Sequence, residues 1–145
     1  MPQRFFSSEE QDVLNASIHK AELYTSGEIR IHLENHCAGD VLDRAANVFK
    51  MLRMHETELK NGVLFYLSVK DRKFAILGDA GINAKVPADF WDSIKASVLH
   101  HFKNGAYATG LTEGIEMAGL KLGEHFPYPN NDVNELSNEI SFYSN

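Results

Sequence analysis

The hydrophobic positions of the chain follow a helical period in four segments. Apolar residues recur there every three to four positions, which places one apolar stripe on each helix. The predicted helices cover residues 8–24, 40–54, 87–104 and 107–126. A serine at position 7 or 8 caps the first helix and Asp40 caps the second, because their side-chain oxygens accept bonds from free N–H groups. Gly110, Gly114 and Gly119 inside the last helix predict close packing against a neighbour.

Three further segments predict β-strands, over residues 28–34, 63–69 and 73–77. The first alternates between apolar and polar residues, which is typical of a strand near the edge of a sheet. The second is apolar on both faces, as in a central strand covered by helices on each side. A helix separates these two strands, so we expect a parallel, right-handed crossover. The short polar turn before the third strand predicts an antiparallel hairpin, and the sheet is therefore mixed.

Length and composition indicate one domain. The chain has 145 residues, of which 43% are hydrophobic and 23% charged, and a chain of this size folds without disulfides or a structural metal. We expect the domain over residues 1–127 and a polar tail over 128–145, in which a short helix and a strand at 140–143 are both open. The single cysteine, Cys37, leaves no intramolecular disulfide. No transmembrane segment or signal peptide is evident, and we expect a cytoplasmic monomer.

The charge balance argues against one class of partner and leaves another open. Twenty Asp and Glu residues oppose fourteen Lys and Arg residues, which gives a formal net charge of -6. Such a surface repels phosphates, so we expect no nucleic-acid binding. Carboxylates are, however, the ligands that Ca²⁺ and Mg²⁺ prefer. Divalent metal ions therefore become the expected partners, with a protein partner as a second expectation.

Short signatures occur in a fixed order along the chain. They are Thr25–Ser26–Gly27–Glu28–Ile29, Asn61–Gly62–Val63–Leu64, Asp71–Arg72, Gly78–Asp79–Ala80–Gly81–Ile82, Val86–Pro87 and Tyr107–Ala108–Thr109–Gly110–Leu111. In this ordered set the chain resembles the TPM domain family over about residues 5–126. The resemblance implies an α/β fold, namely a three-layer α/β/α sandwich with a mixed four-stranded sheet. Only three of these strands are clear from the residue pattern.

The resemblance also bears on function. Similar proteins include an acid phosphatase of the plant thylakoid lumen, photosystem repair proteins and a receptor-associated animal protein, and divalent-cation sites are known among them. The resemblance therefore implies Ca²⁺ or Mg²⁺ as a cofactor. Common bacterial members combine a signal peptide with a membrane segment or a Gly-rich tail. This chain instead resembles a stand-alone bacterial-type TPM domain.

Polar residues gather at one pole of the predicted sheet. The first two strands are parallel and the third is antiparallel, so the loops before the first two and after the third meet there. The candidate metal ligands at this pole are Glu28, Glu56, Glu58, Asn61, Asp79, Asn83 and Asp89. Gly78 and Gly81 allow a tight loop whose carbonyl oxygens would complete the shell. An EF-hand is excluded because the twelfth loop position is Phe90. The simpler alternative is that the side chains bond to turn backbone or are solvated.

The opposite pole is the alternative site. It holds the carboxyl ends of the parallel strands, where open α/β sheets usually bind ligands, and its candidates are Glu34, Asp40 and Asp71. Asp40 is also a helix cap, and Asp71 is an ordinary turn residue. His32, Glu34 and His36 alternate on one strand face and could bind Zn²⁺, but an exposed polar strand face explains them more simply.

Three functions remain open, of which the second is implied mainly by the resemblance to the TPM domain family. The first is a metal-responsive structural or regulatory module that binds Ca²⁺ or Mg²⁺. The second is a metal-dependent acid phosphatase, a phosphomonoesterase in which the cation activates water. A cysteine phosphatase is excluded because Cys37 and Arg44 are separated by six residues instead of five, and no catalytic residue is identified. The third is an assembly factor in which no ion takes part.

Overall fold

A mixed four-stranded sheet forms the centre of the protein. The computed structural model describes residues 5–128 and 140–144. Its strands are β1 (Glu28–Glu34), β2 (Gly62–Ser68), β3 (Lys73–Gly78) and β4 (Ser141–Tyr143), in the order β3-β2-β1-β4. β1 is parallel to both β2 and β4, and β3 is antiparallel to β2. The predicted parallel pairing of β1 with β2 and the antiparallel hairpin of β2 and β3 are therefore confirmed.

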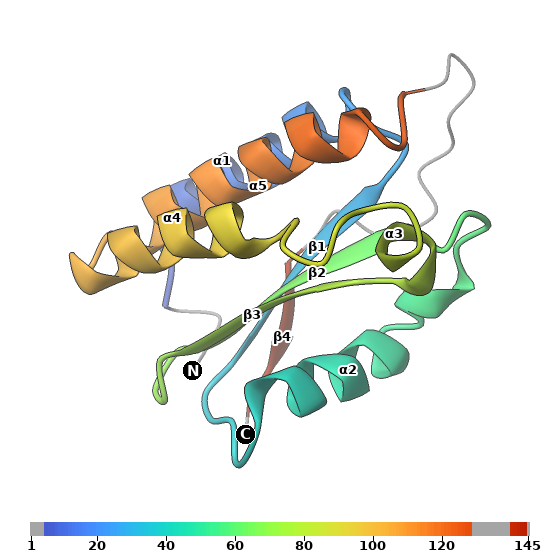
Figure 1. The fold of residues 1–145 in the computed structure, drawn as a ribbon. Coiled ribbons are helices and arrows are strands. Elements are labelled where there is room, and N and C mark those ends of the chain that lie inside the picture. Colours follow the sequence, from blue (N-terminus) through green and yellow to red (C-terminus); the bar gives the residue numbers. More distant parts are fainter. Residues whose placement is uncertain (1–4, 129–139, 145) are drawn as a thin grey trace.

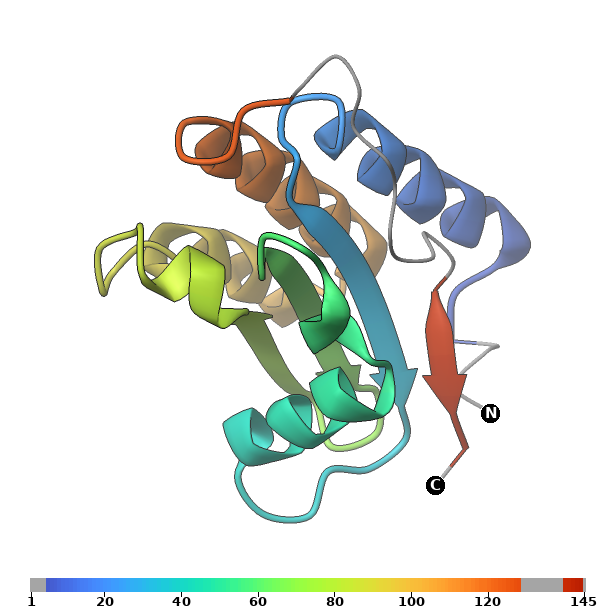
Figure 2. The same cartoon turned by 90° about the vertical axis from the view of Figure 1, so that its right-hand side faces the viewer.

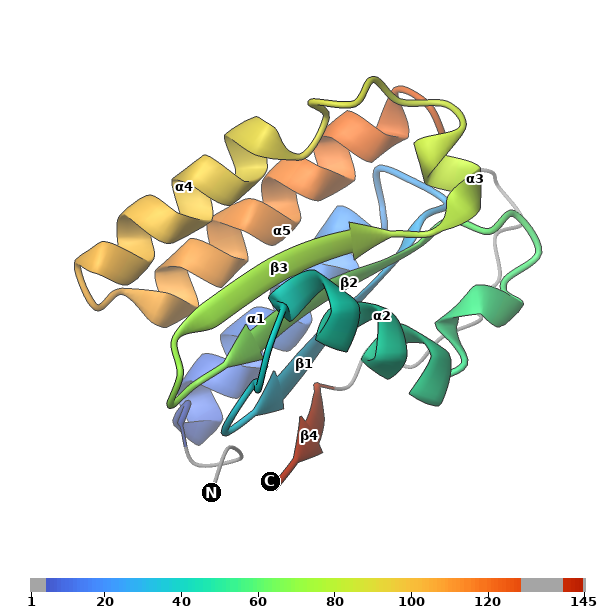
Figure 3. The ribbon, with the colours of Figure 1, turned by 60° about the horizontal axis from the view of Figure 1, so that its bottom comes forward.

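Helices cover both faces of the sheet and make three layers (Figure 1). They are α1 (Ser8–Ala21), α2 (Val41–Met51), α3 (Ala80–Asn83), α4 (Asp92–Lys103) and α5 (Tyr107–Gly123), with a 3₁₀ turn η2 (Met54–Glu56) after α2. α1, α4 and α5 lie on one face and α2 lies on the other, as Figure 3 also shows. The fold is thus the expected α/β/α sandwich.

The two faces bury different residues. Ile29, Ile31 and Leu33 of β1 join Val63 and Phe65 of β2 in the larger core beneath α1, α4 and α5. The smaller core beneath α2 contains Cys37, Ala45, Val48, Phe49, Met54, Leu64, Tyr66 and Ala75. Because β2 contributes to both cores, its side chains are buried along its whole length, as its continuous apolar run predicts.

Local signals explain the starts of α1 and α2 and one close helix contact. Ser7 and Glu10 form a capping box at α1, with bonds of 2.9 and 3.1 Å, and Asp40 accepts the N–H of Asp43 at α2. At Gly119 of α5, a Cβ would lie 2.7 to 2.8 Å from atoms of Ala21. The glycine therefore lets α1 and α5 approach each other closely, as the sequence predicts.

Three sequence expectations need correction. β1 lies next to the edge strand β4, so it is near the edge as predicted, but its polar face is buried instead of exposed. The segment 78–85, for which a loop is predicted, contains the short helix α3. α4 begins at Asp92 rather than near Pro87, because Phe90 enters the core and Trp91 packs against Gly78, which turns the chain before the helix.

The C-terminal tail adds the fourth strand. Ser141–Tyr143 pairs with β1, which decides for a strand at this position. The short helix that is the other expectation for the tail falls largely on residues 129–139, which lie outside the described residues. Among the helices of the described ranges none is long and apolar enough to span a membrane.

Candidate functional site

Backbone hydrogen bonds join three segments at the pole where the cation site was predicted. β1 and β2 begin there, with Glu28 opposite Gly62, and β3 ends there, with Gly78 opposite Val63. The N–H of Asp79 donates to the carbonyl oxygen of Gly62 at 3.0 Å. The N–H of Glu28 donates in the same way to Asn61, at 3.2 Å. The pole is thus a fixed junction of residues 26–28, 57–62 and 78–83.

Asp79 stands at the centre of this junction. One carboxylate oxygen, Oδ1, accepts the N–H of Ala80 at 2.7 Å and caps α3. The other oxygen, Oδ2, is buried and has no hydrogen-bond partner among the described residues. A buried acceptor left in this way calls for an explanation, and an ordered water or a bound ion are the usual ones.

Carbonyl oxygens of the neighbouring segment lie close to Gly81, two residues after Asp79. A Cβ on Gly81 would lie 2.2 Å from the carbonyl oxygen of Leu59 and 2.5 Å from that of Lys60, so only glycine fits there. The N–H of Gly81 donates to Lys60 at 2.9 Å. Gly81 is therefore the position where α3 meets the backbone oxygens before β2, two residues from the Asp79 carboxylate.

The other predicted ligands at this pole are placed in several different ways. Glu56 is exposed and pairs with Arg53 through bonds of 2.6 and 3.1 Å, which hold the pKa of its carboxyl below the ordinary value. The side-chain amide of Asn61 donates to Ser26 at 3.3 Å, and that of Asn83 donates to Gly78 at 3.2 Å. The remaining two differ in burial: Glu28 is buried and Glu58 is exposed.

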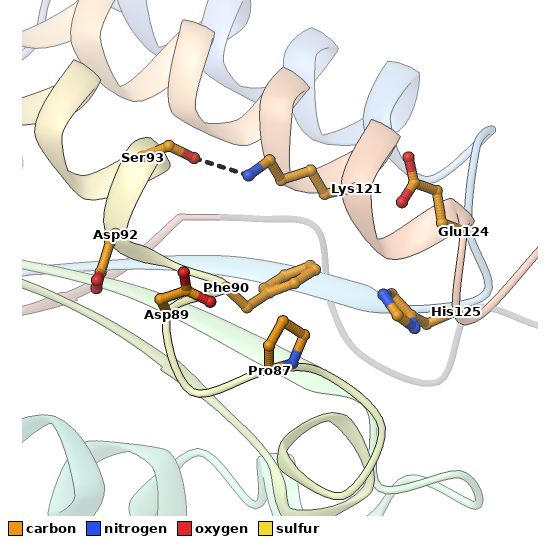
Figure 4. Close-up of a pocket in the computed structure, with 8 residues that line it drawn as sticks. All are labelled: Pro87, Asp89, Phe90, Asp92, Ser93, Lys121, Glu124 and His125. Atoms are coloured by element: carbon orange, nitrogen blue, oxygen red, sulfur yellow. Dashed lines mark hydrogen bonds between the residues drawn. The ribbon is translucent and has the colours of Figure 1, made fainter.

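Asp89 lies in a different place, at a cavity of about 440 Å³ between the start of α4 and the end of α5 (Figure 4). The cavity is lined by Pro87, Asp89, Phe90, Asp92, Ser93, Lys121, Glu124 and His125. Lys121 donates to Ser93 at 2.7 Å and lies 5.8 Å from the ring centre of Phe90. Asp89 thus shares its surroundings with Asp92 and Glu124.

The opposite pole contains a buried polar network around Glu34. Its carboxylate is fully buried and receives two bonds of 2.8 Å from the guanidinium of Arg44. Tyr66 and His32 also bond to it, the latter at 3.1 Å. Burial raises the pKa of a carboxyl, but these donors outweigh it and keep the pKa of Glu34 below its ordinary value. Burial, together with the bond to Glu34, raises the pKa of Tyr66.

The remaining candidates of the alternative site have structural partners. Asp40 caps α2. Asp71 accepts the N–H of Cys37 at 2.7 Å and bonds to Nδ1 of His36 at 3.1 Å, and both bonds lower its pKa. Lys73 donates to the carbonyl oxygens of Cys37 and Gly39 at 2.8 and 2.9 Å. The β2–β3 hairpin therefore clamps the loop between β1 and α2.

Sequence reasoning missed several residues of this network. Arg44, Tyr66 and Ser141 belong to it, yet Arg44 was considered only for its spacing from Cys37, and Tyr66 is part of an apolar run. The exposed polar strand face, which the sequence favoured over a zinc site for His32, Glu34 and His36, is wrong for two of the three, because His32 and Glu34 are buried. The sequence signal for this network was the polar residue His32 in one predicted strand, which lies opposite Tyr66 of the next strand.

The described residues contain no group of three or more His, Cys, Asp or Glu side chains arranged to hold one metal ion. A cation at the first pole would therefore take most of its ligands from backbone carbonyls, amide oxygens and water, with Asp79 as its anionic ligand. Ca²⁺ and Mg²⁺ both accept such oxygens, and Mg²⁺ usually retains several waters.

Comparison with known proteins agrees with this architecture. The family model described as the TPM domain matches residues 2–120, and the chain belongs to the TPM domain family. The NMR structure of the BA42 protein from the psychrophilic bacterium Bizionia argentinensis is 46% identical, covers 96% of each chain and superposes with a TM-score of 0.91. A search of curated proteins found no match.

Two more distant structures share the fold. The N-terminal domain of a P. gingivalis protein is 19% identical, covers 87% of this chain and 82% of its own, and gives a TM-score of 0.68. The N-terminal domain of a Corynebacterium glutamicum protein is 12% identical, covers 90% and 80%, and gives a TM-score of 0.65. At these identities the likeness concerns the fold alone.

Proposed function

We propose that this TPM domain is a metal-responsive module that binds Ca²⁺ or Mg²⁺ at the junction of residues 57–62 and 78–83. The observation that carries the proposal is the buried Oδ2 of Asp79, which has no hydrogen-bond partner among the described residues. A cation beside this oxygen would supply the missing partner. The carbonyl oxygens of Leu59 and Lys60, which lie against Gly81, support a shell made largely of backbone oxygens.

The composition of this shell limits the affinity. Calcium sites in extracellular modules, which are among the weaker ones, bind with dissociation constants of about 10⁻⁴ to 10⁻³ M. A site with Asp79 as its one anionic ligand belongs at or beyond the weak end of that range. The bound ion would act by holding α3 against the segment before β2, because its ligands come from both. The module would therefore respond to high cation concentrations.

The chain carries its own reporter for this test. Trp91 is the only tryptophan, and its Cζ2 would lie 3.0 Å from a Cβ on Gly78, the residue before Asp79. Titration of the full chain with Ca²⁺ alone and with Mg²⁺ alone should shift the amide resonances of residues 58–62 and 78–83. The indole N–H resonance of Trp91 should shift with the same dissociation constant.

Asp79→Asn is the variant that separates binding from folding. Asparagine caps helices as well as aspartate does, so the bond to Ala80 is retained while the charge is removed. We expect the variant to bind at least tenfold more weakly, and Glu9→Gln on the distant α1 to bind like the wild type. Saturable shifts that are unchanged in Asp79→Asn would contradict the proposal. Shifts centred on residues 34–40 would move the site to the other pole and contradict it as well.

A generic phosphate ester, added to the same samples, tests the phosphatase interpretation. Turnover that requires the cation and is lost in Asp79→Asn, with an unchanged amide spectrum, would assign hydrolysis to this site. Binding without turnover is the result expected for a structural or regulatory module.

A further inference from the structure

A groove lies between the first turns of α1 and α5. The two helices lie side by side in the helical layer and run in the same direction (Figure 2). Near their C-terminal ends they approach each other closely, since a Cβ on Gly119 would lie 2.7 to 2.8 Å from atoms of Ala21. Near their N-terminal ends they enclose a groove of about 470 Å³. Its lining residues include Glu9, Glu10, Val13, Ala108, Thr112 and Glu113.

The charged side chains that line this groove are glutamates. Glu9, Glu10 and Glu113 are exposed, and within the described part of the chain no lysine, arginine or histidine is among the lining residues. Glu9 and Glu10 lie in the first turn of α1, where they also interact favourably with the helix dipole. Glu113 lies in the second turn of α5, beyond the reach of that effect, and bonds to Nε2 of His101 at 2.6 Å. The groove therefore attracts positive charge.

The groove also exposes carbon and contains a hydroxyl without a partner. Val13 is 53% exposed, and Ala108 lines the groove with it. The hydroxyl oxygen of Thr112 is shielded from water and has no hydrogen-bond partner among the described residues. Ser17 of α1, by contrast, donates to the carbonyl oxygen of Val13 in its own helix at 3.0 Å. An occupant that suits this groove supplies apolar surface as well as positive charge.

Two other occupants suit the groove less well. A metal ion needs several ligands around one point, and no group of three or more His, Cys, Asp or Glu side chains within the described ranges is arranged in that way. A second copy of the chain carries the same formal net charge of -6, so two copies repel each other. A partner of opposite charge does not meet this repulsion.

We propose that the groove binds a basic segment of a partner protein. Lysine and arginine match both of its features, because each has a long apolar stem that covers carbon and a charged head that stays at a polar rim. The stem of one such side chain lies on Val13 and Ala108, and its head reaches the carboxylates of Glu9 and Glu113. The proposal does not depend on the cation site at Asp79.

Titration of the full chain with a basic peptide tests the proposal. The probe is a peptide of about ten residues that alternates arginine and alanine, added without divalent cations. Amide resonances of residues 8–14 and 107–113 should shift in a saturable way. The same peptide with glutamate in place of arginine should cause no shift. Shifts that are spread over the acidic surface, or that centre on other residues, would overturn the proposal.

Paired variants separate this groove from attraction to the net charge. Glu9→Gln combined with Glu113→Gln should weaken binding about threefold to tenfold, as expected for two exposed ion pairs. Glu56→Gln combined with Glu58→Gln removes the same charge from two exposed positions before β2, and it should bind like the wild type. Equal weakening by the two combinations would show attraction to the net charge alone and would contradict a specific site.

Val13→Lys tests the apolar part of the groove. The position is exposed and lysine is the better helix former, so the fold should be retained, which thermal unfolding checks. The new ammonium group would take the place of the partner's charged head, and the peptide-induced shifts should be lost. Wild-type affinity in Val13→Lys would contradict the proposal. Spermidine that binds as tightly as the peptide would assign the groove to a small polyamine and would overturn it as well.

Discussion

The guanidinium of Arg44 and the carboxylate of Glu34 form a two-pronged ion pair, with both bonds at 2.8 Å, between the first turns of α2 and the end of β1. The Glu34 side chain is fully buried, and that of Arg44 is 25% exposed. The pair therefore links α2 to β1. A paired arginine in this position satisfies an acid that could not otherwise be buried.

Replacing Arg44 by methionine should destabilise the fold. The side chain keeps its length and apolar stem, but Glu34 is left as a buried carboxylate without its cation. We expect a loss of about 2–3 kcal/mol in the free energy of unfolding, which is less than the roughly 3–5 kcal/mol for breaking a fully buried pair because Arg44 is partly exposed. Urea denaturation measures it. Arg53→Met is the matched control, since its pair with Glu56 is exposed, and no measurable change is expected there.

Acid should weaken the fold in two stages. The pKa of His32 is below its ordinary value of 6.5, so the unfolded chain binds the proton first and stability falls as the pH drops below about 6.5. The pKa of Glu34 is below its ordinary value of 4.5, so its contribution is complete above that value and is lost as the pH falls further. Denaturation at pH 7.5, 5.5 and 4 should show both losses, and His32→Gln should remove the first. Equal stability at all three pH values would contradict these assignments.

Gly119→Ala should destabilise the helical layer although alanine is the better helix former. Helix propensity alone predicts a gain of about 1 kcal/mol. The new Cβ would lie 2.7 to 2.8 Å from Ala21, whose backbone atoms cannot yield as a side chain does. We therefore expect a net loss of about 1–3 kcal/mol. The neighbouring Leu120, which is 56% exposed, supplies the control, because Leu120→Ala should change the stability by less than about 0.5 kcal/mol. A more stable Gly119→Ala protein would contradict the close packing.

Local patterns predicted most of the fold. The capping residues Ser7 and Asp40, the continuous apolar run of β2 and the polar turn before β3 each act within a few residues of the element they define. The meeting of Asp79 and Gly62 at one pole of the sheet could also be predicted, because the order of helices and strands determines the strand directions. These features are set by interactions between residues that are close in the sequence, so a single sequence is enough to predict them.

The buried polar network could not be predicted in this way. β1 alternates like an edge strand, and its polar face is buried only because α2 and β4 cover it. Ser141 lies 109 positions after His32, and nothing near either residue indicates the contact. Similarly, Asp79 was identified by residue type, whereas the state of its Oδ2 depends on how α3 packs.

The clamp that the β2–β3 hairpin places on the loop before α2 also governs the chemistry of the only thiol. Cys37 is 2% exposed, and its backbone is held from both sides by Asp71 and Lys73. A thiol reagent reaches the sulfur only in those moments when the loop opens. The rate of alkylation at Cys37 therefore measures how often this loop opens. An intermolecular disulfide between two copies of Cys37 likewise requires the loop to open.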